Sequence, residues 1–257
     1  MAASPEALPR NASIAAKNSA ERWFFSGMAV ALLITIFAGF SRTYYLRAAF
    51  GSPALTPSLL MHGFAFSAWM VLLFVQTSLV AAGRTDIHRR LGVAGAALGM
   101  LMMVLGAYVA ISRVAAGLTL SPPGVTALQG LTLPLATMVV FPVLLGSALW
   151  FRKRTDTHKR LVVIATLELV PAAIGRFPGI FIPIGSVALG PFGLFGVTDM
   201  FLVAMAVYDW RSRGRIHPAT IWGGAFLIVS QPLRLIIGST PAWQSFAAWL
   251  TGLPLFT

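Results

Sequence analysis

Seven long apolar runs restrict the fold of this chain more than any other feature of its sequence. A bilayer core offers the backbone no water to bond with, so a chain crosses it as an α-helix of about 20 apolar residues. The expected spans are residues 23–41, 59–82, 91–112, 131–151, 161–176, 191–210 and 218–239. With 57% hydrophobic and only 10% charged residues, the chain is too apolar for a soluble protein of 257 residues. We therefore predict an all-α polytopic membrane protein.

The distribution of positive charge predicts how these spans are oriented. Fourteen of the 19 lysines and arginines fall before the first span or in the connections after the second, fourth and sixth spans. Positive residues collect on the cytoplasmic side, so we expect a cytoplasmic N-terminus and, after seven crossings, a C-terminus outside. The expected organisation is a cytoplasmic tail (1–22), a transmembrane domain (23–240) and an outer interfacial segment (241–257). The expected location is the inner membrane of a bacterium.

Several classes of protein are excluded by residues that the chain lacks. It has no cysteine, which excludes thioether-bound haem, cysteine-ligated iron–sulfur clusters and disulfides. Its lysines, Lys17, Lys153 and Lys159, lie outside the spans, so a buried retinal Schiff base is excluded. The sequence has no phosphate-binding loop and no nucleophile motif, so it gives no prediction of an enzymatic activity. Most of the net charge of +12 comes from the cytoplasmic tail and loops, and no nucleic-acid partner is expected.

Two of the cytoplasmic loops have nearly the same sequence. Residues 84–91 are RTDIHRRL and residues 154–161 are RTDTHKRL, 70 positions later. Because each loop ends one span and begins the next, spans two and three are expected to be a weak parallel repeat of spans four and five. A purely structural role is also open, in which Thr or Asp caps the following helix and Arg and His anchor it among headgroups.

Three of the four histidines are expected at one membrane level. His88, His158 and His217 lie where the third, fifth and seventh spans leave the cytoplasm. In a bundle with short loops, spans three and five are parallel and lie across a diagonal, so His88 and His158 are expected to face each other. This pair predicts the two axial ligands of one b-type haem.

Two further interpretations involve the same histidines. Small residues on one face of the third span either admit a flat ligand beside His88 or serve close helix packing: Gly92, Gly95, Gly99 and Gly106. Loop carboxylates and imidazoles together form a candidate site for a transition metal: His88, His158, His217, Asp86 and Asp156. The arginines of the same loops repel a divalent cation, so this site ranks below the haem.

The second span carries a stripe of side chains that is expected to face the bundle. His62, near the outer end, shares this face with Phe66, Trp69, Leu73 and Gln76 at helical spacing. The fourth span lies diagonally opposite and has no histidine. It offers only Gln129, Thr137 and Met138. A haem held by His62 and a methionine is therefore a weaker alternative.

Ionisable side chains within the spans carry a strong presumption of function, because burying a charge in a bilayer costs at least about 2.5 kcal/mol. These residues and their amide neighbour are Glu168, Arg176, Asp199, Arg234 and Gln231. Ion pairs among the last three spans either line a path for a proton or small anion or only fix helix packing. The outer half also carries arginines without acidic neighbours, which predicts affinity for an anionic ligand or lipid headgroups: Arg42, Arg47, Arg113, Arg176 and Arg234.

Several motifs resemble known membrane proteins. The segments Met61-His62-Gly63 to Gly92, His158 to Arg176, and Asp199 to Arg234 resemble bacterial polytopic membrane proteins of unknown function, a resemblance that implies architecture but no activity. The His-Gly and His-Arg-x-Leu-Gly motifs also resemble cytochrome b561-type proteins, in which four histidines on four helices bind two b-type haems. This chain departs from that pattern, since its fourth span has no histidine.

The sequence therefore leaves three functions open. The leading hypothesis is a redox protein with one b-type haem on His88 and His158. The first alternative is a cofactor-free transporter or channel for protons or a small anion that uses Glu168, Asp199, Arg176 and Arg234. The second is a structural or assembly subunit that binds a partner in a membrane complex or a second copy of itself.

Overall fold

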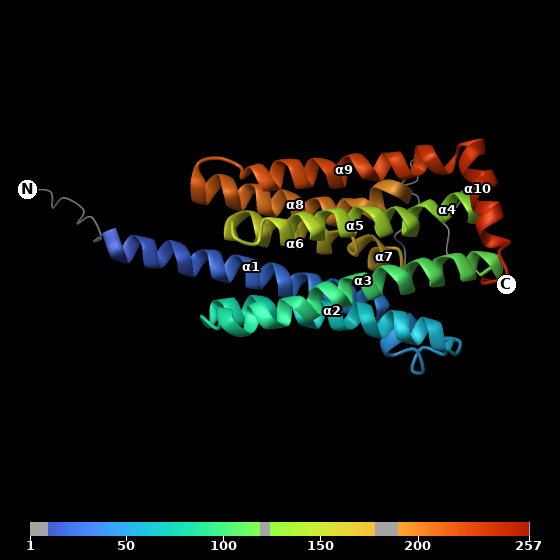
Figure 1. Cartoon of the computed structure of the whole chain (residues 1–257), viewed down its shortest axis with the longest axis horizontal. Coiled ribbons are helices and arrows are strands. Elements are labelled where there is room, and N and C mark those ends of the chain that lie inside the picture. Colours follow the sequence, from blue (N-terminus) through green and yellow to red (C-terminus); the bar gives the residue numbers. More distant parts are fainter. Residues whose placement is uncertain (1–9, 119–123, 178–189, 257) are drawn as a thin grey trace, which may run out of the picture.

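A computed structural model describes residues 10–118, 124–177 and 190–256 of the chain, and this part contains helices and no strand (Figure 1). The elements in chain order are α1 (Arg10–Phe40), the π-helical turn η1 (Ser41–Tyr45), α2 (Pro57–Ala81), α3 (Thr85–Ala115), α4 (Ala127–Gly130), α5 (Thr132–Trp150), α6 (Thr155–Leu167), α7 (Val170–Ile174), α8 (Gly190–Arg213), α9 (Pro218–Gly238) and α10 (Pro241–Thr251).

Six helical segments of the described residues are long and apolar enough to cross a membrane. They are Ser19–Tyr45, Pro57–Ala81, Thr85–Ala115, Ala127–Trp150, Gly193–Arg213 and Pro218–Gly238. Their outward faces are apolar as well. On α3, for example, the exposed fractions of Val93 and Met100 are both 74%, which suits a surface covered by lipid. The chain is an integral, multi-pass membrane protein, and the prediction of an all-α fold is confirmed.

The expected fifth span is interrupted and is not among these six segments. Helix α6 ends at Leu167 after 13 residues, and α7 has only five residues. Pro171 explains the interruption, because proline has no N–H to donate and its ring clashes with the carbonyl four residues earlier, here that of Leu167. Both pieces lie within the bundle, with α6 against α5 and α9 and α7 against α1 and α8. A count of seven spans, which requires α6 and α7 to form one crossing, stays a prediction.

The connections between the helices lie at two ends of the bundle (Figure 1). The start of α1 and the α2–α3, α5–α6 and α8–α9 connections lie at one end, which we call the basic end. The α1–α2 connection, α4, α10 and the C-terminus lie at the other, which we call the distal end. This grouping agrees with the predicted topology. The assignment of the basic end to the cytoplasm stays a prediction.

The repeated loops begin α3 and α6 at the same point of the motif. Helix α3 starts at Thr85 and α6 at Thr155, and the N-cap residues are Arg84 and Arg154, neither of which makes a side-chain capping bond. The Thr or Asp cap that the motif offered is therefore not formed. Beyond the motif the two helices differ, since α3 continues without a break to Ala115. The internal repeat stays a prediction.

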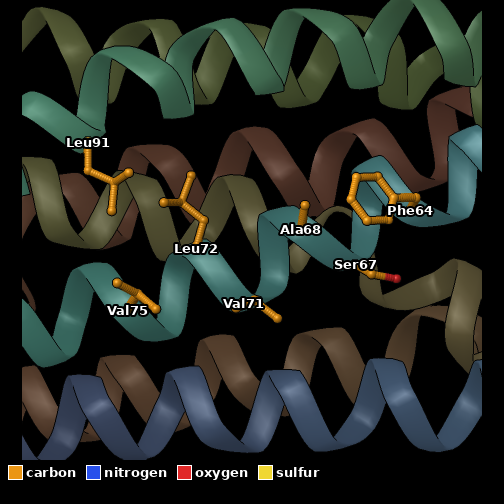
Figure 2. A pocket seen from close by; sticks show the side chains of 7 residues that line it. All are labelled: Phe64, Ser67, Ala68, Val71, Leu72, Val75 and Leu91. Atoms are coloured by element: carbon orange, nitrogen blue, oxygen red, sulfur yellow. The ribbon is translucent and has the colours of Figure 1, made fainter.

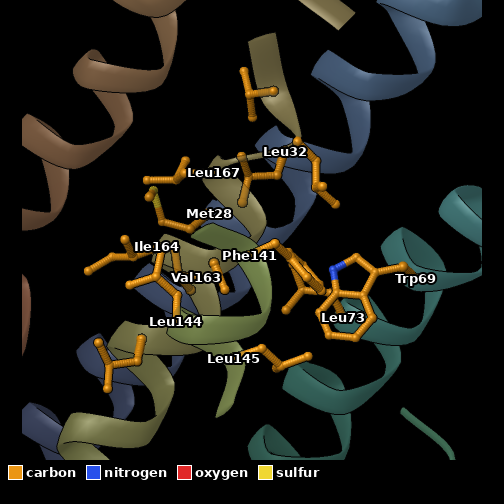
Figure 3. Close-up of a cluster of buried hydrophobic side chains, with 14 of the residues drawn as sticks. Met28, Leu32, Trp69, Leu73, Phe141, Leu144, Leu145, Val163, Ile164 and Leu167 are labelled. Atoms are coloured by element: carbon orange, nitrogen blue, oxygen red, sulfur yellow. The ribbon is translucent and has the colours of Figure 1, made fainter. Parts of the chain in front are cut away.

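The hydrophobic core lies where α1, α2, α5 and α6 meet (Figure 3). Leu32 of α1 and Phe141 of α5 are fully buried there, together with Ile164 of α6. Trp69 of α2 packs edge-on against Phe141, with the ring centroids 5.1 Å apart, and its indole N–H donates to the Thr166 hydroxyl at 3.2 Å. This hydrogen bond satisfies the polar atom of a buried tryptophan and fixes α6 against α2.

A surface groove of about 430 Å³ follows α2 and is almost wholly apolar (Figure 2). Six of its seven lining residues belong to α2, and Leu91 comes from α3. Its single polar side chain, Ser67, already donates to the Gly63 carbonyl oxygen and bonds the Tyr45 hydroxyl. The groove is therefore part of the apolar outer surface.

Substitutions at two glycines of α1 can test how closely α1 packs against α7. A Cβ atom on Gly39 would lie 2.5 Å from the backbone oxygen of Ala173, whereas Gly27 has nothing within 4 Å. Gly39→Ala is expected to destabilise the protein by about 1–3 kcal/mol because backbone atoms have no room to yield. Gly27→Ala should be neutral or stabilising by up to about 1 kcal/mol. Thermal unfolding in mild detergent measures both, and equal effects would contradict the packing of α1 on α7.

Candidate functional site

A cavity of about 580 Å³ lies in the distal half of the bundle. It is lined by residues from α1, η1, α2, α3, α4, α5, α7, α8 and α9, and by the break between α6 and α7. Most of the lining is apolar. The ionisable residues in it, apart from the two tyrosines of η1, are His62, Arg113, Glu168, Arg176 and Arg234. Three of the four residues proposed from sequence for transport, Glu168, Arg176 and Arg234, therefore share one site.

The ion pair of Glu168 and Arg234 forms one wall of this cavity. Arg234 Nη1 lies 2.7 Å from Glu168 Oε1, and Arg234 Nη2 donates to Glu168 Oε2, also at 2.7 Å. Thr137 of α5 donates to Glu168 Oε1 at 2.7 Å. Both charged residues are buried, each with an exposed fraction of 3%. Glu168 can enter this geometry because it directly follows α6, at the break before Pro171. The ion pair expected from the sequence is thus present.

Two further arginines line the cavity without an acidic partner. The guanidinium of Arg176 donates to the Ala172 carbonyl oxygen and stacks over Phe40, with its Cζ 4.2 Å from the ring centroid. The chain has seven acidic residues, and among the described ones none forms a salt bridge with Arg113 or Arg176. Three arginines and one glutamate therefore leave two positive charges uncompensated in the cavity.

His62 lines the same cavity with an unsatisfied ring nitrogen. Its Nδ1 is buried and has no hydrogen-bond partner among the described residues, and its ring stacks at a tilt on Phe66. Met138 of α5 also lines the cavity, so both residues of the proposed His–Met haem site border one space. Gln129 is used otherwise, in a capping box with Thr126 at the start of α4. Of the α2 side chains that were expected to face the bundle, His62 and Phe66 therefore line this site.

Asp199, Gln231 and Gln76 lie outside the cavity lining. Gln231 of α9 donates to Asp199 of α8 at 2.8 Å, which joins the two helices without a positive charge. Gln76 of α2 donates to the His88 carbonyl oxygen at 3.3 Å. A transport path through Glu168 and Arg234 therefore does not include Asp199 at the cavity wall.

His88 and His158 face each other near the basic end, as their diagonal placement predicted. Their ring centroids are 6.3 Å apart and the ring planes are at 83°. His158 Nδ1 lies 2.8 Å from the Ala148 carbonyl oxygen, which selects the tautomer with the proton on Nδ1 and leaves Nε2 as a free ligand atom. His88 Nδ1 is buried and has no partner among the described residues.

The glycine face of α3 is filled by side chains of neighbouring helices. A Cβ on Gly95 would lie 3.0 Å from Leu72, one on Gly99 2.8 Å from Leu145, and one on Gly106 2.9 Å from Met138. Gly92 is less tight, at 3.7 Å from Gln76. These contacts favour the packing interpretation of the face over a slot for a flat ligand.

His217 lies apart from the histidine pair and has a structural role. It is the N-cap of α9, and its Nδ1 accepts the backbone N–H of Ala219 at 3.0 Å. Partial burial, and then the charges of Arg160 and Arg213, lower the pKa of the imidazole, which keeps Nδ1 available as an acceptor. The capping bond therefore uses one of its two nitrogens.

The candidate metal ligands are distributed over several places. Asp86 is exposed, with its carboxylate 3.6 Å from Arg84, whereas Asp156 bonds Lys159 and Arg213. Although burial acts to raise the pKa of Asp156, the hydrogen bonds and charges of those two cations lower it well below its usual range. No three His, Asp or Glu side chains among the described residues gather closely enough to hold a metal ion. The five-residue metal site stays a prediction without a cluster to support it.

A buried ion pair at the basic end joins Arg160, which was expected in a loop, to Asp209. Arg160 and Asp209 are fully buried, and the guanidinium donates to both carboxylate oxygens, with Nε at 2.9 Å from Oδ1 and 3.2 Å from Oδ2. The Thr220 hydroxyl and the His217 backbone N–H donate to Asp209 as well. The signal available in the sequence was Asp209 itself, one of only seven acidic residues, at the end of an apolar run.

A second layer of ion pairs surrounds this buried one. Glu21 of α1 lies 2.5 Å from Lys159 of α6 and 3.3 Å from Arg213 of α8, and Arg213 also bonds Asp156 at 2.9 Å. These contacts join α1, α6 and α8 at the basic end. Because several charges form one network, it fixes the ends of these helices better than isolated surface pairs would.

Comparisons of the chain with known protein families, with curated proteins and with solved structures found no match.

The Arg160–Asp209 pair supports a prediction on stability. Asp209→Asn or Arg160→Gln is expected to cost about 3–5 kcal/mol, because each leaves an uncompensated buried charge. The double substitution Arg160→Met with Asp209→Leu should cost less than either single change. Asp86→Asn, at the exposed pair with Arg84, is the control and should change stability by at most about 0.5 kcal/mol. Thermal unfolding in mild detergent is the measurement, and equal melting temperatures for Asp209→Asn and Asp86→Asn would contradict it.

Proposed function

We propose that this protein binds a small anion in the distal cavity and carries it across the membrane, which we expect to be the inner membrane of a bacterium. The observation that carries the proposal is the cavity itself, because it lies within a transmembrane bundle and contains two arginines that form no salt bridge with the acidic residues that the structure describes. In this proposal Arg176 and Arg113 attract the anion, and Glu168 and Arg234 form the wall beside it.

The interrupted helix supports transport over a purely structural role. Irregular backbone at membrane depth is tolerated only where it is buried in protein or lines a cavity, and in many transporters broken helices form the substrate site. Here the break after α6 places Glu168 in the cavity wall. An ion pair such as Glu168–Arg234 can equally fix helix packing. Packing alone, however, accounts for neither Arg113 nor Arg176.

The charges of Arg113 and Arg176 also favour an anionic ligand. An arginine in a membrane segment is expensive to bury unless it is paired or reaches water or lipid headgroups. Arg176 is held in place by the Ala172 carbonyl and by Phe40, neither of which neutralises it. An anion bound in the cavity would supply the missing charge. The role of a complex subunit stays a prediction.

Flux through proteoliposomes tests the proposal. Hexanesulfonate, chloride and phosphate are suitable probes, because none of them leaks through lipid readily as a neutral acid. At least one is expected to move faster than in protein-free liposomes, and Arg176→Gln should lower that flux at least tenfold, since a hydrogen bond to a charged group contributes about 1.5–3 kcal/mol.

The matched control is Arg47→Gln. Arg47 lies at the same end of the bundle but outside the cavity lining, where it donates to the Pro53 carbonyl oxygen at 3.3 Å. This variant should transport at the unchanged rate. Rates equal to those of empty liposomes for all three anions would sink the transport function, and equal losses in both variants would assign the effect to surface charge.

A second candidate function is a b-type cytochrome with His88 and His158 as axial ligands. The observation in its favour is the facing pair of imidazoles, one of which has its Nδ1 proton fixed by the Ala148 carbonyl. Bound haem would supply one-electron chemistry, with the two histidines holding its iron. The pair fits as a donor set, but the adjacent glycine face is filled by Leu72 and Leu145, which ranks this function second.

An ultraviolet–visible spectrum distinguishes a cytochrome from a cofactor-free protein. Protein purified in mild detergent from haem-replete cells should, if the cytochrome function holds, give a Soret band and sharp reduced α and β bands that His88→Ala and His158→Ala each remove. His217→Ala is the control, since that residue caps α9 and should leave the bands unchanged. A colourless wild-type protein at full haem supply would eliminate this candidate.

A further inference from the structure

We propose that the ligand of the distal cavity is an amphipathic organic anion, with a carboxylate, sulfonate or phosphate head and an apolar body, and that it is not a small inorganic ion. This inference rests on the proposed function, since it names the substrate class of the same site. It follows from the size of the cavity, the division of its lining into charged and apolar parts, and the unsatisfied groups on its wall.

The size of the cavity exceeds what an inorganic anion needs. Its volume of about 580 Å³ falls within the range of roughly 300–1,000 Å³ that is typical of small-molecule sites. Chloride or phosphate would fill only a small part of that space and leave the rest to water. Water against an apolar wall is unfavourable, whereas an apolar ligand body gains free energy from the same contact.

The apolar part of the lining comes from several helices. Phe66 of α2, Val109 of α3, Met138 of α5 and Phe195 of α8 contribute large side chains to it. Such a wall offers no hydrogen bond to a polar molecule. It is complementary to an alkyl or aromatic group.

The charged part of the lining suits an anionic head. Glu168 and Arg234 neutralise each other at 2.7 Å, so the net positive charge comes from Arg113 and Arg176. A guanidinium offers five N–H donors in a planar fork that matches carboxylate, sulfonate or phosphate oxygens. Stacking on Phe40 and the bond to the Ala172 carbonyl fix the Arg176 fork and use only one of its nitrogens among the described residues.

His62 provides a second, independent indication of a polar ligand group. Its Nδ1 is buried in the cavity wall and has no hydrogen-bond partner among the described residues. A buried polar atom without a partner costs free energy that a bound ligand would recover. The imidazole, Arg113 and Arg176 are therefore the groups that a ligand head would engage.

The test is a binding titration by calorimetry with the full chain in lipid nanodiscs, with empty nanodiscs as the blank. The probes are methanesulfonate, propanesulfonate and hexanesulfonate, which share one head and differ in chain length, and hexyltrimethylammonium, which keeps the chain and reverses the charge. Affinity should rise about two- to fourfold for each added methylene. Hexyltrimethylammonium should bind at least tenfold more weakly than hexanesulfonate.

Two variants separate the head from the body. Arg176→Gln should weaken hexanesulfonate at least tenfold, while Arg47→Gln leaves it unchanged. Ala110→Phe, which places a ring in the cavity, should weaken hexanesulfonate but not methanesulfonate. Affinity independent of chain length, or equal affinity for the cation, would overturn the inference. If Arg176→Gln does not fold, the chain-length series and the cation still decide.

The outcomes distinguish this inference from the transport function. Binding of hexanesulfonate with the expected chain dependence but without flux would retain the ligand class and reject transport. Flux of chloride or phosphate without any binding of hexanesulfonate would retain transport and reject the ligand class.

Discussion

The absence of water from the bilayer core is the constraint on which this structure depends. Every buried polar group must find its partner inside the chain or bear the full cost of having none. The chain meets this requirement with cross-helix pairs: Trp69 with Thr166, Gln231 with Asp199, Arg234 with Glu168, and Arg160 with Asp209. These pairs connect α2, α6, α8 and α9. Two of the described buried side-chain atoms that lack a hydrogen-bond partner, His62 Nδ1 and Arg234 Nε, belong to residues that line the distal cavity.

The two ends of the bundle use their charges in opposite ways. At the basic end each described carboxylate except that of Asp86 belongs to one network, which closes the bundle between α1, α6, α8 and α9. At the distal end positive charge exceeds negative charge around an open space. The proposed ligand site and the network of ion pairs therefore lie at opposite ends of the bundle.

Features that one helix determines could be predicted from the sequence more completely than features that form where two or more helices meet. Length and hydropathy located the membrane segments, and helical position brought His88 toward His158. The break in the fifth span was missed although Pro171 lies within it. A single proline hardly changes the mean hydropathy of a span, but it removes a backbone hydrogen bond and can end a helix. The Arg160–Asp209 pair was missed for a different reason. A sequence indicates the depth and face of a side chain, but not which distant helix lies opposite.

The distribution of ionic partners along the chain has a consequence for biogenesis. Helix α6 has only 13 residues and carries Arg160. The partner of Arg160, Asp209, follows 49 residues later in the chain, and the partner of Glu168, Arg234, follows 66 residues later. At roughly 5–20 residues per second, the ribosome supplies these partners several seconds after α6 has emerged. Until then Arg160 and Glu168 are charged residues without these partners, which is unfavourable in lipid. Helices α6 and α7 are therefore expected to complete their packing in the membrane only after α8 and α9 have been made.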